Sequence, residues 1–183
     1  MARIDPLPLD RMNAEQRALY DSIAAAGRSA ARGPFSVLIR SPEVAGKLAD
    51  LVTIFHSETA MKMALKELAI LTVARLYTAQ YEWFVHEKRA LDAGVPKSVV
   101  EALRRRETPA FDDPEQALVH RLTTEIIETH ALGDDTYARA VSAWGDGAVI
   151  ELISQIATYV AVALVLVVFR VDIPDGKSDP LPA

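Results

Sequence analysis

Apolar residues recur at intervals of three and four positions along most of the chain, and this period is typical of amphipathic α-helices. No stretch of any length alternates between apolar and polar residues as a half-buried strand does. We therefore predict an all-α fold of about seven to eight helices in a single domain over residues 1–183. The expected helices cover residues 13–26, 41–57, 63–77, 80–93, 96–105, 113–130, 135–144 and 148–169.

Capping and helix-stopping residues mark these boundaries. The string Asn13-Ala14-Glu15-Gln16 has the spacing of a capping box. Ser41-Pro42-Glu43 supplies an N-cap, a proline at the first helical position and an acid in the first turn. Gly33-Pro34-Phe35 predicts a turn, and Gly145-Asp146-Gly147 predicts a break between the last two helices. Prolines predict a coil tail over residues 174–183.

The last predicted helix is apolar nearly all round over residues 156–169, which indicates burial on all sides. One chain of this size rarely surrounds such a helix, so we expect part of it to face another subunit. Its longest uninterrupted apolar run, residues 160–169, is shorter than the roughly 20 residues of a membrane span. The N-terminal residues show no apolar signal-peptide core. We expect no membrane association and a cytoplasmic location.

Composition narrows the classes of function. The chain has 183 residues, half of them apolar, with 25 acidic and 20 basic side chains and a formal net charge of −5. This balance argues against nucleic-acid binding, which needs a positive surface. The basic run Arg104-Arg105-Arg106 is expected to be a solvated helix end. The chain has no cysteine, which excludes disulfides, cysteine-ligated metals and thiol nucleophiles within it.

Glu67 occupies an unusual position on the helix predicted over residues 63–77. The face that it shares with Met63, Ile70 and Ala74 is otherwise apolar. A buried carboxylate needs a partner, or its pKa rises. Two interpretations are open: Glu67 is satisfied by a backbone amide or by Arg75, or it belongs to a proton relay.

The next predicted helix offers a partner for such a relay. Glu82 and His86 are four residues apart, and therefore on one helix face. An acid beside an imidazole fixes its tautomer and raises its basicity, as a general base near neutral pH requires. Tyr81 adds a hydroxyl and Trp83 a large apolar wall. The alternative is an ordinary surface ion pair between helix neighbours.

Other site chemistries have less support. Glu82, His86 and Glu67 could form a carboxylate-rich metal site, but there is no second Glu-x-x-His element with suitable partners. His56 shows no ligand spacing, and we interpret it as a partly buried structural residue. The chain has no Gly-x-Ser-x-Gly signature and no glycine-rich phosphate loop. We predict no metal and no cofactor.

The same residues carry a family resemblance. The strings Leu65-Lys66-Glu67-Leu68-Ala69-Ile70-Leu71 and Tyr81-Glu82-Trp83-Phe84-Val85-His86, followed by Ala93-Gly94-Val95, are similar to the carboxymuconolactone decarboxylase family, which includes the alkylhydroperoxidase-D-like proteins. Gly33-Pro34-Phe35 upstream and Glu151-Leu152-Ile153 downstream also fit. The similarity spans about residues 33–176.

This resemblance implies an all-helical protein that assembles into dimers, trimers or hexamers. The peroxidase branch of the family uses a glutamate, a Cys-x-x-Cys pair and a histidine. By that pattern the glutamate falls on Glu67 and the histidine on His86, whereas the two cysteine positions fall on Ala79 and Glu82. Neither residue can form a sulfenic acid or a disulfide, so a thiol peroxidase activity is disfavoured even if the family label applies.

The resemblance and the residues together favour a decarboxylase or proton-transfer enzyme acting on a small anionic or lactone metabolite. His86 is the expected general acid/base, Glu82 would orient or relay, and Glu67 would hold the other side of the imidazole. Tyr81 would donate to a developing enolate oxygen. An anionic substrate also needs a cation, for which the nearby candidates are Arg75, Lys88 and Arg89. Two other possibilities stay open: a non-catalytic oligomer that binds a small ligand, and a structural oligomer without one.

Overall fold

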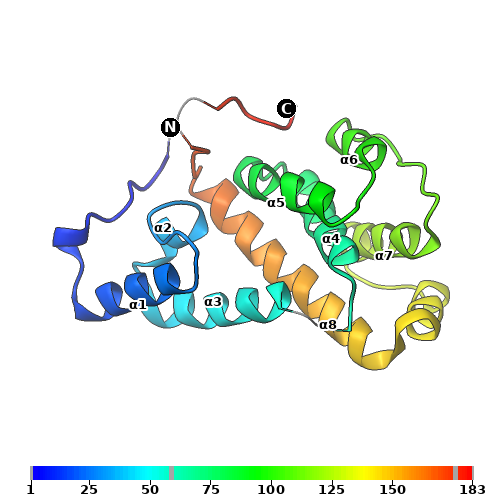
Figure 1. Cartoon of the computed structure of the whole chain (residues 1–183), viewed down its shortest axis with the longest axis horizontal. Coiled ribbons are helices and arrows are strands. Elements are labelled where there is room, and N and C mark those ends of the chain that lie inside the picture. Colours follow the sequence, from blue (N-terminus) through cyan, green and yellow to red (C-terminus); the bar gives the residue numbers. More distant parts are fainter. Residues whose placement is uncertain (1, 58–59, 175–176, 183) are drawn as a thin grey trace.

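The computed structural model describes residues 2–57, 60–174 and 177–182, and all regular structure within these ranges is helical. The all-α prediction is confirmed. A short 3₁₀ turn precedes eight α-helices (Figure 1). The elements are η1 (Leu9–Arg11), α1 (Ala14–Ala25), α2 (Pro34–Leu38), α3 (Pro42–His56), α4 (Met63–Leu76), α5 (Gln80–Asp92), α6 (Lys97–Arg104), α7 (Pro114–Thr129) and α8 (Asp134–Val168).

Most predicted boundaries agree with these elements to within two residues. Side-chain caps are present at Asn13 and Asp113, whereas the Ser41 side chain makes no capping bond at the start of α3. Asn13 and Gln16 form the expected capping box at the start of α1. One prediction needs correction: Pro34–Leu38 forms a short helix where a turn was expected. The predicted break before the last helix is confirmed, because the two arms of α8 meet at a kink at Gly145, whose φ of 79° and ψ of 163° are not helical.

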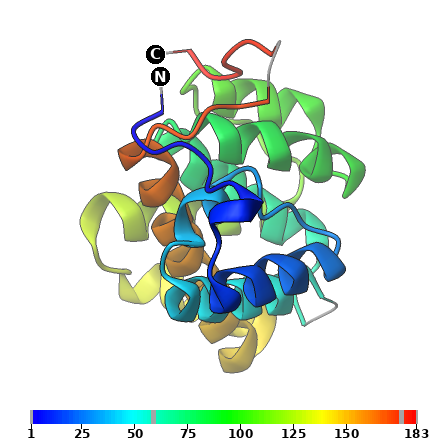
Figure 2. The same cartoon turned by 90° about the vertical axis from the view of Figure 1, so that its left-hand side faces the viewer.

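Helix α4 is the centre of the fold and packs against α5, α6, α7 and α8 (Figure 1). Every residue of α4 from Leu65 to Arg75 is buried, including Lys66, Glu67 and Thr72. On the other side of α8, helices α1 to α3 form a second group with its own small apolar cluster around Ile23 and Phe35 (Figure 2). Helix α8 contacts both groups, so residues from distant parts of the chain meet along it.

Within one chain α8 is not buried on all sides, and the expectation that another subunit covers the rest stays a prediction. Ile150, Leu164 and Val168 are 65%, 46% and 46% exposed. These side chains share one face with Ala157 and Ala161, which are also exposed. The reason is that the neighbouring helices cover only part of its circumference.

Of the described helices, α8 is the one long and apolar enough to cross a membrane. The uninterrupted run of residues 160–169 is shorter than a span, whereas the average over a longer window includes the residues that interrupt that run. Half of the apolar window is buried inside the fold.

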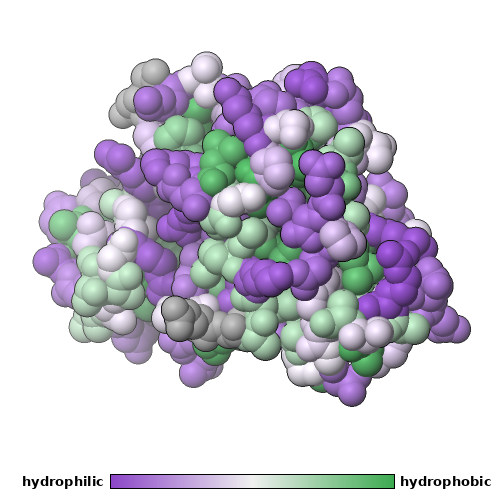
Figure 3. Space-filling view, turned by 45° about the vertical axis from the view of Figure 1, so that its right-hand side comes forward, coloured by the Kyte–Doolittle hydropathy of each residue, from purple (hydrophilic) through white to green (hydrophobic). Residues whose placement is uncertain are grey.

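The molecular surface and the C-terminal segment can also be compared with the sequence predictions. Apolar side chains on the face drawn in Figure 3 lie in separate patches among hydrophilic ones. Arg105 is exposed and pairs with Glu107, as expected for a solvated helix end. Arg104 differs, because its side chain is only 20% exposed, lies over the ring of Trp83 and pairs with Glu87. The C-terminal segment is coil at residues 174 and 177–182, and Leu181 is buried, with Gln80 bonded to its backbone. Residues 175, 176 and 183 of the predicted tail lie outside the described residues.

Candidate active site

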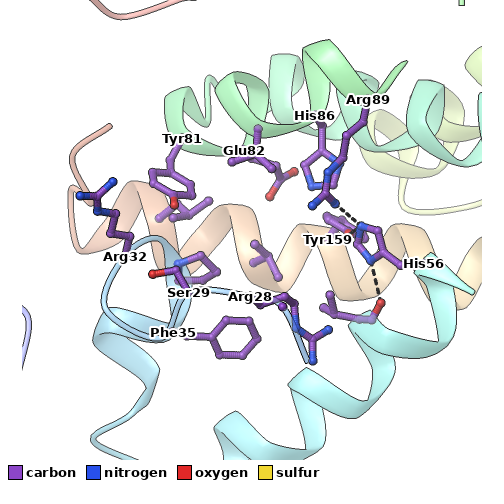
Figure 4. Close-up of a pocket in the computed structure, with 16 residues that line it drawn as sticks. Arg28, Ser29, Arg32, Phe35, His56, Tyr81, Glu82, His86, Arg89 and Tyr159 are labelled. Carbon is purple, nitrogen blue, oxygen red and sulfur yellow. Dashed lines mark hydrogen bonds between the residues drawn. The ribbon is translucent and has the colours of Figure 1, made fainter. Parts of the chain in front are cut away.

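A pocket of about 220 Å³ lies between α5, α8, the end of α3 and the segment that leads into α2 (Figure 4). Apolar residues, among them Phe35, Val162 and Leu166, form part of its wall. The remainder carries a concentration of ionisable side chains. These are Arg28, Arg32, His56, Tyr81, Glu82, His86, Arg89 and Tyr159.

Glu67 and His86 form a buried hydrogen-bonded pair behind this wall. Nδ1 of His86 lies 2.7 Å from Oε2 of Glu67, and both side chains are buried. A carboxylate accepts from Nδ1, which leaves Nε2 as the nitrogen that can take up a proton. The interpretation in which Arg75 or a backbone amide satisfies Glu67 is therefore wrong, and Arg75 instead donates to Thr78.

Glu82 does not orient His86, contrary to our expectation from their spacing. Both carboxyl oxygens of Glu82 are buried without a hydrogen-bond partner among the described residues. In Figure 4 this carboxyl group points from α5 into the pocket. Burial raises the pKa of Glu82 well above its usual range, which favours the neutral, proton-bearing form. The surface ion pair is also excluded, since both Glu82 and His86 are buried.

His56 belongs to the site, although its sequence context predicts only a structural role. Its Nδ1 donates to the backbone oxygen of Val52 at 2.8 Å. Its Nε2 accepts from Nη1 of Arg89 at 2.5 Å, and the two dashed lines in Figure 4 mark these bonds. Burial lowers the pKa of His56, which favours the neutral imidazole. Its ring centroid lies 5.8 Å from that of His86.

Two tyrosines complete the polar lining. Tyr159 of α8 packs edge-on against His86 with ring centroids 5.2 Å apart, and its hydroxyl lies 3.4 Å from Nε2 of His56. Burial raises the pKa of Tyr159 well above its usual range, and burial also raises the pKa of Tyr81. Both phenols therefore keep their protons near neutral pH. Tyr159 lies more than 70 residues from His86 in the sequence, so no local pattern identifies it as a site residue.

The three candidate cations, Arg75, Lys88 and Arg89, lie in three different surroundings. Arg89 lines the pocket, whereas Lys88 pairs with Asp92 at the surface at 2.5 Å. Arg75 lines a different pocket. Arg28 and Arg32 also line the pocket with Arg89. The sequence did not identify these two arginines as site residues. With Glu82 neutral, this lining attracts small anions.

One group of possible metal ligands is present among the described residues. His56, Glu67 and His86 each offer one ligand atom, and these three atoms lie within 4.8 Å of one another. The set differs from the one considered from sequence, because His56 takes the place of Glu82.

Comparison with known proteins adds no assignment. No protein-family model matches the chain, and no curated protein matches it.

Proposed function

We propose that the protein is an enzyme that performs acid/base chemistry, either decarboxylation or proton transfer, on a small anionic or lactone metabolite. The observation that carries the proposal is the buried hydrogen bond between Glu67 and His86 at the wall of a small polar pocket. The resemblance of the surrounding strings to carboxymuconolactone decarboxylases is consistent with this chemistry, and we propose membership of that family.

His86 serves as the general base in this proposal. When Nε2 takes a proton from the substrate, the imidazole becomes a cation. The Glu67 carboxylate stabilises this cation through the hydrogen bond at Nδ1. Glu67 also fixes the tautomer, so Nε2 is free to accept before each turnover.

Glu82 and Tyr81 supply the acid side of the reaction. A neutral Glu82 carboxyl group in the pocket donates to an oxygen on which negative charge develops. The Tyr81 hydroxyl is a second donor of the same kind. A base and a proton-bearing acid in one pocket are the groups that formation of an enolate requires.

Arginine side chains bind the anionic end of the substrate. Arg89 is exposed at the pocket and makes no ion pair among the described residues, so its guanidinium is available to a carboxylate. Phe35 and Leu166 then contact the apolar part of the molecule. Thiol peroxidase chemistry is not part of the proposal, because the chain has no cysteine.

We also propose a cytoplasmic homo-oligomer. The exposed face of α8 that includes Ile150, Leu164 and Val168 supports this assembly, because a second copy would cover these side chains. We propose neither a nucleic-acid partner nor a membrane partner.

A ligand and turnover screen tests the function. Small aromatic acids, muconate-type lactones and β-keto acids are added to chelator-treated wild type, His86→Ala and the control His130→Asn, which changes an exposed histidine. We expect a carboxylate that stabilises all three proteins and is turned over by wild type and His130→Asn only. Binding without turnover in the wild type would support the alternative, a non-catalytic binding protein. If no compound binds, the structural oligomer becomes the better account.

A further inference from the structure

We propose that His56, Glu67 and His86 form a binding site for one divalent transition-metal ion. The three residues come from α3, α4 and α5, and their candidate ligand atoms lie within 4.8 Å of one another. Two imidazoles and one carboxylate form a ligand set that transition metals use while keeping positions open for other ligands. The proposal goes beyond the acid/base function, because metal binding is measured without a substrate.

The surroundings of His56 resemble those of a metal-bound histidine. Metal-ligating histidines nearly always donate their second ring N–H to a carboxylate, a backbone carbonyl or water. Nδ1 of His56 makes this bond to Val52 at 2.8 Å, which directs the lone pair of Nε2 toward the pocket wall. The ring orientation that a metal needs is thus fixed before the ion binds.

Oxygen atoms near this position extend the ligand set. The Tyr159 hydroxyl lies 3.4 Å from Nε2 of His56, on the side of the ring that would face the ion. Glu82, in the same pocket, has two buried oxygens without a partner among the described residues. Unsatisfied buried oxygens are costly, and a bound cation or its water ligands would satisfy them.

Two existing bonds must open when the ion binds. Nη1 of Arg89 occupies the lone pair of His56 Nε2 at 2.5 Å. The Arg89 side chain is exposed, so it can turn toward solvent and leave that position to the ion. The hydrogen bond between Glu67 and His86 is replaced by two bonds to the same cation, and the proton on Nδ1 of His86 moves to Nε2 or is released to solvent. The ion and the Arg89 guanidinium therefore compete for one place.

Metal binding and base catalysis by His86 exclude each other, because both engage the ring of His86 and the Glu67 carboxylate. We therefore expect Zn²⁺ to suppress the metal-free activity proposed above. A failure of the acid/base proposal would not affect this site, since its primary test uses Zn²⁺ alone.

The test is calorimetric titration of Zn²⁺ into the chelator-treated full chain, with Co²⁺ absorption spectra to report the coordination geometry. We expect one ion per chain for wild type and for His130→Asn, which removes an exposed histidine. His56→Ala should weaken binding more than about 100-fold, because it removes a ligand rather than an outer partner. This residue is only half-buried at the end of α3, so the variant should fold, as circular dichroism will show.

Arg89→Met provides an independent arm. It removes the competing guanidinium and keeps an apolar stem of similar reach, so it should tighten Zn²⁺ binding relative to wild type. Equal Zn²⁺ affinity in wild type and His56→Ala, or no binding by wild type and Arg89→Met, would overturn the proposal.

Discussion

Glu67 of α4 and His86 of α5 are joined by a 2.7 Å hydrogen bond inside the protein, although 19 residues separate them in the chain. The bond assigns the proton on Nδ1 and so determines which imidazole nitrogen can act as a base. For the proposed enzyme, we predict that Glu67→Gln lowers kcat by about 10²–10⁴-fold, the range of general acid–base catalysis, because His86 loses the carboxylate that fixes its tautomer. Steady-state kinetics and ¹⁵N NMR of the imidazole check this.

The matched control for this prediction is Glu15→Gln, which changes an exposed acid in the first turn of α1. Its kcat should equal that of wild type. If Glu67→Gln keeps full activity and the same His86 tautomer, the hydrogen bond has no role in catalysis.

The pH dependence of stability should change in Glu82→Gln. Burial raises the pKa of Glu82 in the folded protein, so the folded state keeps a proton that the unfolded chain releases above about pH 4.5. The contribution of Glu82 to stability is therefore complete below that pH and is lost as the pH rises. Because glutamine cannot ionise, we expect the variant to exceed wild type in unfolding free energy at pH 8 but not at pH 4.

Urea denaturation at both pH values measures this difference, and Glu15→Gln again serves as the exposed control. A wild type that is no less stable than Glu82→Gln at pH 8 would show that Glu82 ionises in the folded protein without penalty.

Gly33 is required by the close approach of Tyr81. Its φ is +65°, and a Cβ atom placed there would lie 2.6 Å from Cε1 of Tyr81. Gly33→Ala should therefore destabilise the protein by about 1–3 kcal/mol. Gly147→Ala is the opposite control: this glycine lies within α8 with open space around it, so alanine should stabilise by roughly 0.5–1 kcal/mol. Thermal unfolding of both variants gives the comparison, and equal effects would contradict it.

Arg89 should determine the affinity for small carboxylates. Loss of a charge-assisted hydrogen bond costs about 1.5–3 kcal/mol, which corresponds to roughly 10–100-fold in Kd. We expect this loss for Arg89→Ala with the best carboxylate from the screen. Lys88→Ala removes the adjacent cation, which points to solvent and pairs with Asp92, and should leave Kd unchanged. Similar losses in both variants would indicate a general charge effect instead of a binding site.

The exposed face of α8 should mediate self-association. We expect wild type to sediment as a homo-oligomer and Leu164→Glu to sediment as a smaller species with unchanged helicity, because a buried glutamate would be unpaired at the interface. Val44→Glu, on α3, changes an apolar residue that is 57% exposed and serves as the control. A wild type that sediments as a monomer would refute the assembly.

The sequence by itself determines the helices and most of their ends. Apolar periodicity, the Asn13 capping box and the glycine at position 145 act within a few residues, so local interactions decide these features. The sequence also identifies Glu67 and His86 as unusual, because each carries polar chemistry on a helix that the fold must bury.

Only the tertiary structure decides which of these groups meet. Spacing along α5 indicates a pair between Glu82 and His86, yet His86 bonds to Glu67 of α4, and Glu82 has no hydrogen-bond partner among the described residues. His56 and Tyr159 join the site because α3 and α8 cross beside α5, and the exposed stripe of α8 exists because its neighbours cover only part of it. These outcomes depend on how separate helices pack, and a period read along one helix contains no information about the side chains that approach from another.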